Sequence, residues 1–186
     1  YLDINEVKKA VNPNSVEETE RYEFRWFGKS AAKRNAFTPT RATLHYDEKR
    51  SVNAETTENI IIEGENLEVL KVLASSYRNK VKCIYIDPPY NTGAKDWKYN
   101  NDYVDTADTY RHSKWLSMMK RRLLLAKRLR NPKDSVLIVT IDEKEYLHLG
   151  CLLEELFPEA RMQMVSILIN PGGVSRLGQF GRTDEY

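Results

Sequence analysis

From residue 59 onward, the sequence alternates between short apolar runs and longer stretches in which apolar residues recur at helical spacing. The apolar runs lie at 60–62, 81–87, 135–142 and 162–169, and the helical stretches at 66–77, 109–130 and 143–157. Alternation of this kind predicts parallel strands joined by right-handed helical crossovers. We therefore expect an α/β fold with a doubly wound, mostly parallel sheet and helices on both of its faces.

Residues 1–58 are rich in charged residues and only weakly periodic. We expect them to form an irregular N-terminal arm with one short helix, whose aromatic residues at 22–28 pack on the main body. The rest of the chain is expected to divide into a domain over 59–170 and a closing loop over 171–186.

The composition, with 41% hydrophobic and 30% charged residues, is ordinary for a globular protein, and the formal net charge of +2 does not by itself indicate a nucleic-acid binder. No apolar run approaches the roughly 18 residues of a membrane span. The apolar segments around Cys83 and Cys151 predict core thiols in a cytoplasmic protein. Because His45, His112 and His148 have no neighbour at metal-ligand spacing, we expect no metal site.

Polar residues follow three of the predicted strands, at the edge where open α/β sheets bind ligands. They are Glu63-Gly64-Glu65, Asp87-Pro88-Pro89-Tyr90 and Asp142. Asp142 is also placed to cap the next helix, and we favour that role over one in a site.

Within the stretch IYIDPPYNTG, residues 84–93, the Asp87 side chain and the two proline carbonyls present hydrogen-bond acceptors without donors. Pro88 and Pro89 fix two φ angles and have carbonyl groups but no N–H, and Asp87 adds a carboxylate. Two such acceptors suit the two hydrogens of an exocyclic amino group, while the Tyr90 ring can stack on its base. Polarised in this way, the amino nitrogen could attack a positively charged methyl donor, provided that the base is flipped out of its duplex. The alternative is that Asp-Pro-Pro-Tyr only forms a turn after a strand and binds no ligand.

The sequence also resembles a known family. Asp-Pro-Pro-Tyr after an apolar strand resembles the catalytic motif of amino-group DNA methyltransferases. The wider stretches IIIEGENLEVLKVLASSYRNKVKCIYIDPPYNTG and HSKWLSMMKRRLLLAKRL resemble β-class adenine-N6 methyltransferases, above all the modification subunits of type III restriction systems. The resemblance runs from about residue 26 to 170 and is closest over 60–129.

The resemblance implies a Rossmann-like methyltransferase fold that is incomplete here, with S-adenosylmethionine as cofactor. It implies double-stranded DNA as substrate, a homodimer for the intact protein and a restriction subunit as partner. In this family a Gly-rich cofactor motif and a target-recognition region follow the catalytic half, and no Phe-x-Gly-x-Gly occurs in this sequence. We therefore expect a fragment that is inactive in isolation, with 171–186 leading into the recognition region.

Carried over by position, the resemblance gives each motif residue a role. Asp87, Pro88 and Pro89 would bind the amino group and Tyr90 would stack on the adenine. The residues expected near the cofactor are Asn91, Thr92 and Gly93, which begin the loop over the base, and Glu63, Gly64, Glu65 and Asn66, where the family has Gly-Asp-Asn.

The helix predicted over 109–130 has one apolar and one cationic side. Its apolar stripe consists of Leu116, Met119, Leu123 and Ala126, and its cationic ridge of Lys114, Arg121 and Arg128 with Lys120 and Lys127 beside it. Contact with DNA phosphates by Lys114, Lys120 and Arg121 is one reading of the ridge. A solvated helix face is the commoner one.

The loop before this helix carries Trp97, Tyr99 and Tyr103. These aromatic residues either contact DNA bases or pin the loop to the surface, and the length of the loop favours a function.

Two other functions stay open. An RNA or N4-cytosine methyltransferase would use similar chemistry, although Asp87 favours adenine in DNA. A non-catalytic DNA-binding or assembly domain would keep the fold without the activity.

Overall fold

The computed structural model describes residues 7, 10–12, 23–93, 97–99, 102–168, 170–176 and 179–186. Its helices in these ranges are α2 (Lys29–Phe37), the 3-10 helix η2 (Glu48–Arg50), α3 (Asn66–Ser76), α4 (Arg111–Leu129) and α5 (Tyr146–Leu156). Its strands are β1 (Cys83–Ile86), β2 (Lys98–Tyr99), β3 (Asp102–Tyr103), β4 (Val136–Val139), β5 (Ile167–Leu168), β6 (Val174–Arg176), β7 (Gln179–Arg182) and β8 (Asp184–Glu185).

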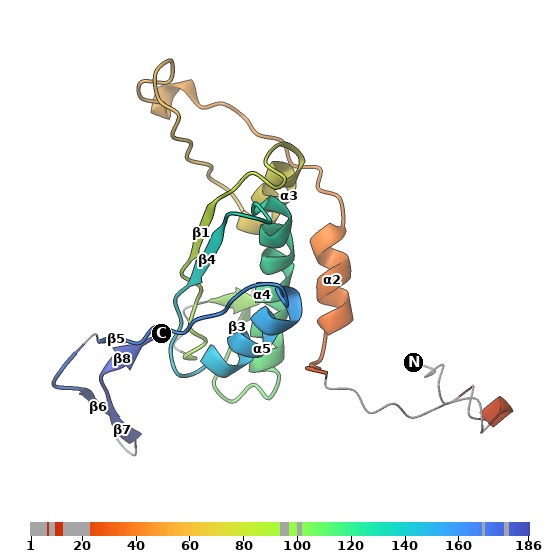
Figure 1. Cartoon of the computed structure of the whole chain (residues 1–186), viewed down its shortest axis with the longest axis vertical. Helices are drawn as coiled ribbons and strands as arrows, with labels where there is room; N and C mark the ends of the chain where they lie inside the picture. Colours follow the sequence, from red (N-terminus) through yellow and green to blue (C-terminus); the bar gives the residue numbers. More distant parts are fainter. Residues whose placement is uncertain are drawn as a thin grey trace.

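Strands β1 and β4 form a parallel pair, which confirms a mixed α/β architecture (Figure 1). Cys83 lies opposite Val136 and Ile86 opposite Val139. The connection between them contains the 19-residue helix α4, long enough for a parallel crossover. Thr140 donates its backbone N–H to the carbonyl of Ile86 at 3.0 Å, so the two strands end side by side.

Helix α4 is the centre of the molecule, since α2, α3 and α5 all pack against it (Figure 1). The predicted apolar stripe on this helix is confirmed, because all four of its residues are buried, with Leu123 completely so. The inward side chains of the strands, Ile86, Leu137 and Val139, join the same core. This packing fixes the carboxyl ends of β1 and β4 relative to the first turns of α4.

The strand predicted at 60–62 was wrong. Residues 60–62 form no strand, and Ile60 and Ile61 are 68% and 97% exposed. The run predicted at 162–169 contains only the two-residue strand β5, which pairs antiparallel with β8. An apolar run becomes a strand only when a neighbour completes its hydrogen-bonding ladder, and among the described residues neither run has a parallel partner.

The β1–β4 pair is covered on one face. In both strands exposed and half-buried residues alternate, and Tyr85, Val136 and Ile138 are exposed on the outer face. The helices lie on the opposite face (Figure 1), so the described residues do not form the expected layers on both sides of a sheet. Cys83, predicted to be buried, is exposed for the same reason, and Cys151 is half-buried.

The predicted helices exist, but their starts differ from the expected caps. Glu65 caps α3 by accepting from the backbone N–H of Glu68 at 3.0 Å. Helix α4 begins at Arg111, and α5 begins at Tyr146 after a turn in which Asp142 accepts from the backbone N–H of Lys144 at 2.9 Å.

The N-terminal arm contains the expected short helix, α2. Of the aromatic residues expected to pack on the main body, Phe24 and Trp26 do so, whereas Phe27 is 76% exposed. The segment over 38–65, with η2, extends away from the helices (Figure 1). Short strands β6 to β8 lie in the segment expected as a loop. None of the described helices combines the length and apolar character needed to cross a membrane.

Candidate active site

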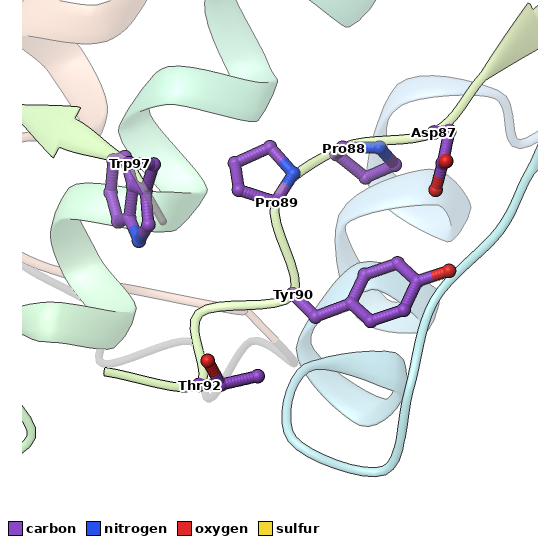
Figure 2. A pocket seen from close by; sticks show the side chains of 6 residues that line it. All are labelled: Asp87, Pro88, Pro89, Tyr90, Thr92 and Trp97. Atoms are coloured by element: carbon purple, nitrogen blue, oxygen red, sulfur yellow. The ribbon is translucent and has the colours of Figure 1, made fainter. Parts of the chain in front are cut away.

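An open pocket of about 600 Å³ lies just beyond the carboxyl end of β1 (Figure 2). It is lined by Asp87, Pro88, Pro89, Tyr90, Thr92 and Trp97. All four residues of the Asp-Pro-Pro-Tyr motif therefore meet in one concavity, of a volume usual for small-ligand sites.

The carboxylate of Asp87 is oriented by a residue that the sequence reading missed. Thr140, the residue after β4, donates its hydroxyl hydrogen to Asp87 Oδ1 at 2.6 Å. A carboxylate offers about four lone-pair sites, so Asp87 can accept further hydrogens while Thr140 holds it. The signal for Thr140 was its position at the end of the neighbouring parallel strand.

The two prolines are anchored to α4 through one carbonyl group. Trp115, a fully buried residue of α4, donates its indole N–H to the carbonyl oxygen of Pro89 at 2.7 Å. This bond ties the motif loop to α4. It also favours the Pro88 carbonyl over that of Pro89 as the acceptor left for a ligand.

Tyr90 is half-buried with its ring at the pocket. Burial raises the pKa of its phenol, and the negative charges of Glu185 and Asp87 act in the same direction. The ring therefore stays neutral at physiological pH. Glu185 lies near the pocket because the C-terminal segment is tied to the end of β4, where Ile141 and Tyr186 exchange two backbone hydrogen bonds of 2.8 and 2.9 Å.

Asn91 and Gly93 both require unusual backbone conformations after the motif. Asn91 has a φ of +60°, is 1% exposed, and accepts from the indole N–H of Trp97 at 3.1 Å. Gly93 has a φ of +83°, and a Cβ there would lie 2.0 Å from Cγ2 of Thr106. Gly93 is therefore a position that only glycine fills without strain.

The residues expected near a cofactor do not all come together. Thr92 lines the pocket, whereas residues 63–65 precede α3, Asn66 begins it, and none of the four lines the pocket. Glu63 pairs with Arg50 at 2.5 Å, and Glu65 with Arg122 at 2.8 Å. The Glu63 and Glu65 side chains remain 75% and 55% exposed, and such carboxylates suit a ligand that carries hydroxyl and amino donors.

The residues expected to contact DNA fall into two groups. Lys114 and Arg121 both lie over the ring of Tyr99, at 5.9 and 5.8 Å from its centroid. By contrast, Lys120 is 4% exposed and pairs with Glu155 at 2.9 Å, and Trp97 is 8% exposed in the core. Lys120 and Trp97 therefore have structural partners, and so does Lys114, which forms an ion pair with Asp108. Lys114, Arg121 and Tyr99 form one cluster. The side chain of Tyr103 lies outside the described residues.

His112 and His148, which the sequence reading treated as unrelated, meet at one carboxylate. Their Nδ1 atoms lie 2.6 and 2.8 Å from Oε1 and Oε2 of Glu145, a residue with no exposed surface. Arg111 donates its Nε–H to Nε2 of His112 at 3.2 Å, so His112 carries its proton on Nδ1 and donates it to Glu145. No sequence pattern predicts this cluster, because His112 and Glu145 are 33 positions apart in the sequence.

Together these features define an α/β protein with a rigid pocket, rich in acceptors, at the carboxyl edge of parallel strands. The model of the DNA methylase family matches residues 81–185, which is more than half of the chain. The chain therefore belongs to the DNA methylase family, and its sequence resemblance to that family is confirmed.

Individual relatives are modification subunits and methyltransferases. The chain is 32% identical to the EcoPI Mod subunit of a type III restriction-modification enzyme from Escherichia phage P1, over 90% of this chain and 30% of that protein. It is 41% identical to the probable type III HindVI Mod subunit of Haemophilus influenzae, over 68% and 16%. It is 32% identical to the type II methyltransferase M.KpnI of Klebsiella pneumoniae, over 62% and 28%. The chain thus spans about 30% or less of the length of these relatives.

Proposed function

We propose that this chain is the part of a DNA adenine-N6 methyltransferase that holds the target base, in a restriction-modification system of type III. The observation that carries the proposal is the pocket in which Asp87, Pro88 and Tyr90 meet. Family membership and the similarity to type III Mod subunits support it.

In the proposed reaction, the chain binds an adenine that has left its duplex. The Asp87 carboxylate and the Pro88 carbonyl accept the two hydrogens of the amino group, and Tyr90 stacks on the ring. These acceptors would pyramidalise the nitrogen and stabilise the positive charge that develops on it as its bond to the methyl carbon forms and the bond of that carbon to the sulfonium sulfur breaks, which leaves a neutral thioether. The proton of the methylated nitrogen then leaves to water, so Asp87 need not act as a strong base.

The proposed cofactor is S-adenosylmethionine, whose sulfonium group supplies an electrophilic methyl group. The segment Glu63-Gly64-Glu65-Asn66 would border this cofactor. The carboxylates of Glu63 and Glu65 would accept its hydroxyl and amino hydrogens. The loop over 91–93 would border the methyl group, a role supported by the position of Thr92 in the pocket lining.

The complete fold is proposed to be a doubly wound parallel sheet, of which β1 and β4 are neighbouring strands. Support comes from the parallel β1–β4 pair and from the apolar side chains on its uncovered face, which further layers of a larger protein would cover. Double-stranded DNA is the proposed substrate, with Lys114, Arg121 and Tyr99 as contacts. The names of the type III relatives support a restriction subunit as partner, and a homodimer follows from the sequence resemblance.

Label transfer from S-adenosylmethionine tests the proposal. The longest chain that the gene encodes would be incubated with labelled cofactor and with unmethylated DNA or RNA, and the labelled nucleoside would be identified. We expect labelled N6-methyl-2′-deoxyadenosine from DNA and no labelled nucleoside from RNA, and we expect this label to be lost in Asp87→Ala. Label on cytosine or in RNA would contradict the substrate, and cofactor-independent DNA binding without label would favour a non-catalytic domain.

A further inference from the structure

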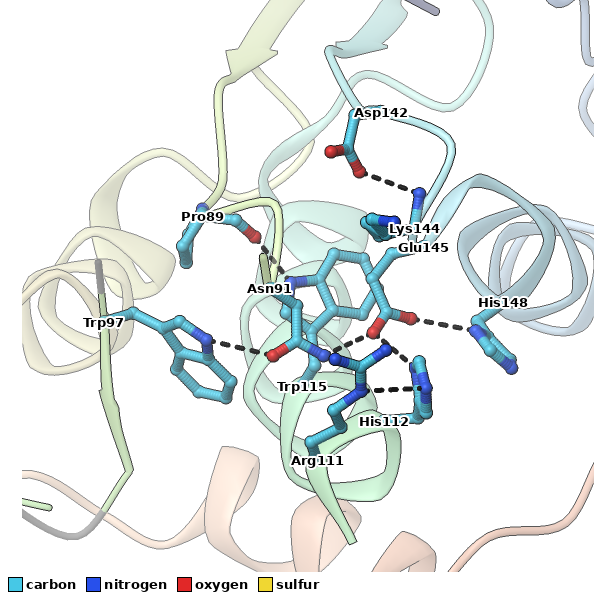
Figure 3. A network of polar contacts seen from close by, with 10 residues as sticks. All are labelled: Pro89, Asn91, Trp97, Arg111, His112, Trp115, Asp142, Lys144, Glu145 and His148. Carbon is cyan, nitrogen blue, oxygen red and sulfur yellow. Dashed lines mark hydrogen bonds and ion pairs between the residues drawn. The ribbon is translucent and has the colours of Figure 1, made fainter. Parts of the chain in front are cut away.

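Glu145 lies at the centre of a buried polar network that joins α5 to the motif loop (Figure 3). Its carboxylate has no exposed surface. A buried carboxylate is costly unless hydrogen bonds satisfy it. Three side chains do so here: the amide of Asn91 donates to Oε1, which also contacts His112, and His148 contacts Oε2.

The network reaches the motif through the residue that follows Tyr90. Asn91 uses both ends of its amide, because Nδ2 donates to Glu145 and Oδ1 accepts from Trp97. These bonds hold Asn91 in its left-handed conformation, which sets the direction in which the chain leaves Tyr90. With the bond from Trp115 to Pro89, the loop is held on both sides of the Tyr90 ring.

We propose that Glu145 is a positioning residue for the motif loop: through Asn91 it fixes Tyr90 and the prolines in the geometry that receives the target base. The inference rests on the proposed function, and it assigns to α5 a role that no motif residue reveals. Glu145 does not line the pocket itself, so its effect on the reaction is indirect.

The arrangement of the histidines fits hydrogen bonding rather than chelation of a metal ion. The two imidazoles contact different oxygens of the carboxylate, at 2.6 and 2.8 Å. Ligand atoms that surround one ion at about 2.0–2.2 Å in a tetrahedron lie farther apart than this. The guanidinium of Arg111 beside His112 also disfavours a further cation.

The test exchanges the two partners. Asn91→Asp places a carboxylate against the buried carboxylate of Glu145. Glu145→Gln places an amide against the amide of Asn91. In the double variant an amide at 145 can again donate to a carboxylate at 91, which still accepts from Trp97. Glu155→Gln is the matched control: it removes a carboxylate of α5, the helix that Glu145 directly precedes, and this carboxylate pairs with Lys29 and Lys120, away from the loop.

In the longest chain that the gene encodes, we expect Glu145→Gln to lower kcat for methyl transfer by about 10- to 100-fold, with KM for DNA nearly unchanged. Asn91→Asp should lower kcat further than Glu145→Gln does. The double variant should have a higher kcat than Asn91→Asp alone. Glu155→Gln should leave kcat unchanged even where its Tm falls equally.

Hydrogen exchange of the amides of 90–93, measured on the same proteins, separates this inference from the proposed function. We expect faster exchange there in Glu145→Gln and not in Glu155→Gln, whether or not the wild-type protein methylates DNA. Unchanged exchange, or a kcat equal to that of the control, would overturn the positioning role. A wild-type kcat that falls with a chelator and returns with Zn²⁺ would overturn it in favour of a metal site.

Discussion

The loop over 87–93 and the segment over 60–66 contrast within one small chain. The loop follows an apolar run that the sequence predicts as a strand, and the segment begins with another such run, 60–62. The loop is held by Trp115 of α4 and by Thr140 and Glu145, which lie at the two ends of the connection between β4 and α5. The segment has exposed isoleucines and no strand. The contrast shows that the motif is built by contacts within this chain, whereas the preceding run has no described strand to pair with.

The largest effect should come from the core that supports the loop. Leu123→Ala removes a fully buried side chain of α4, and we expect it to lower the free energy of unfolding by about 2–5 kcal/mol. Ile61→Ala, at a side chain that is 97% exposed, should change it by less than about 0.5 kcal/mol. Urea denaturation of both variants measures the difference. Equal losses would mean that residues 60–62 are buried in solution.

The next effect concerns the left-handed turn at Gly93. We expect Gly93→Ala to destabilise the protein by about 1–3 kcal/mol, because the methyl group meets Thr106 and the backbone conformation is unfavourable. Gly150→Ala is the matched control, since a Cβ there meets nothing within 4 Å and alanine favours the helix by up to about 1 kcal/mol. The two melting temperatures should move in opposite directions. A rise in the melting temperature of both variants would contradict the left-handed conformation and close packing of Gly93.

A smaller effect, dependent on pH, should arise at Glu155. Burial opposes ionisation, but hydrogen bonds from Lys29 and Lys120 hold the pKa of Glu155 below its usual value. Its contribution to stability is therefore fully present above the unfolded pKa of about 4.3 and is lost as pH falls through the folded pKa.

Glu155→Gln should accordingly cost about 1 kcal/mol or less at pH 7 and nothing at a pH below both values. Denaturant unfolding at several pH values measures this, with Glu154→Gln as the exposed control. A loss that persists in acid would show that packing, and not charge, is responsible.

The sequence predicted the local parts of this molecule well. The apolar stripe of α4 has a period that any solvent-facing helix of a globular protein must obey, and Asp87 to Tyr90 form their pocket because adjacent residues fix one another. It predicted the long-range parts poorly. Thr140, Trp115 and Glu145 lie 26 to 54 positions from their partners in the motif loop, and no pattern in one sequence reports such pairs. The strand at 60–62 failed for the same reason, since pairing depends on a distant neighbour.

The most direct test is whether the pocket recognises the exocyclic amino group of adenine. Adenosine and purine riboside, which lacks that group, would be titrated into the isotopically labelled chain and followed by NMR. We expect adenosine to shift the amide resonances of 90–93. Purine riboside should bind about tenfold or more weakly, because the Asp87 carboxylate and the Pro88 carbonyl would have no amino hydrogens to accept. Equal binding of the two nucleosides, or shifts confined to residues away from Asp87 and Tyr90, would contradict it.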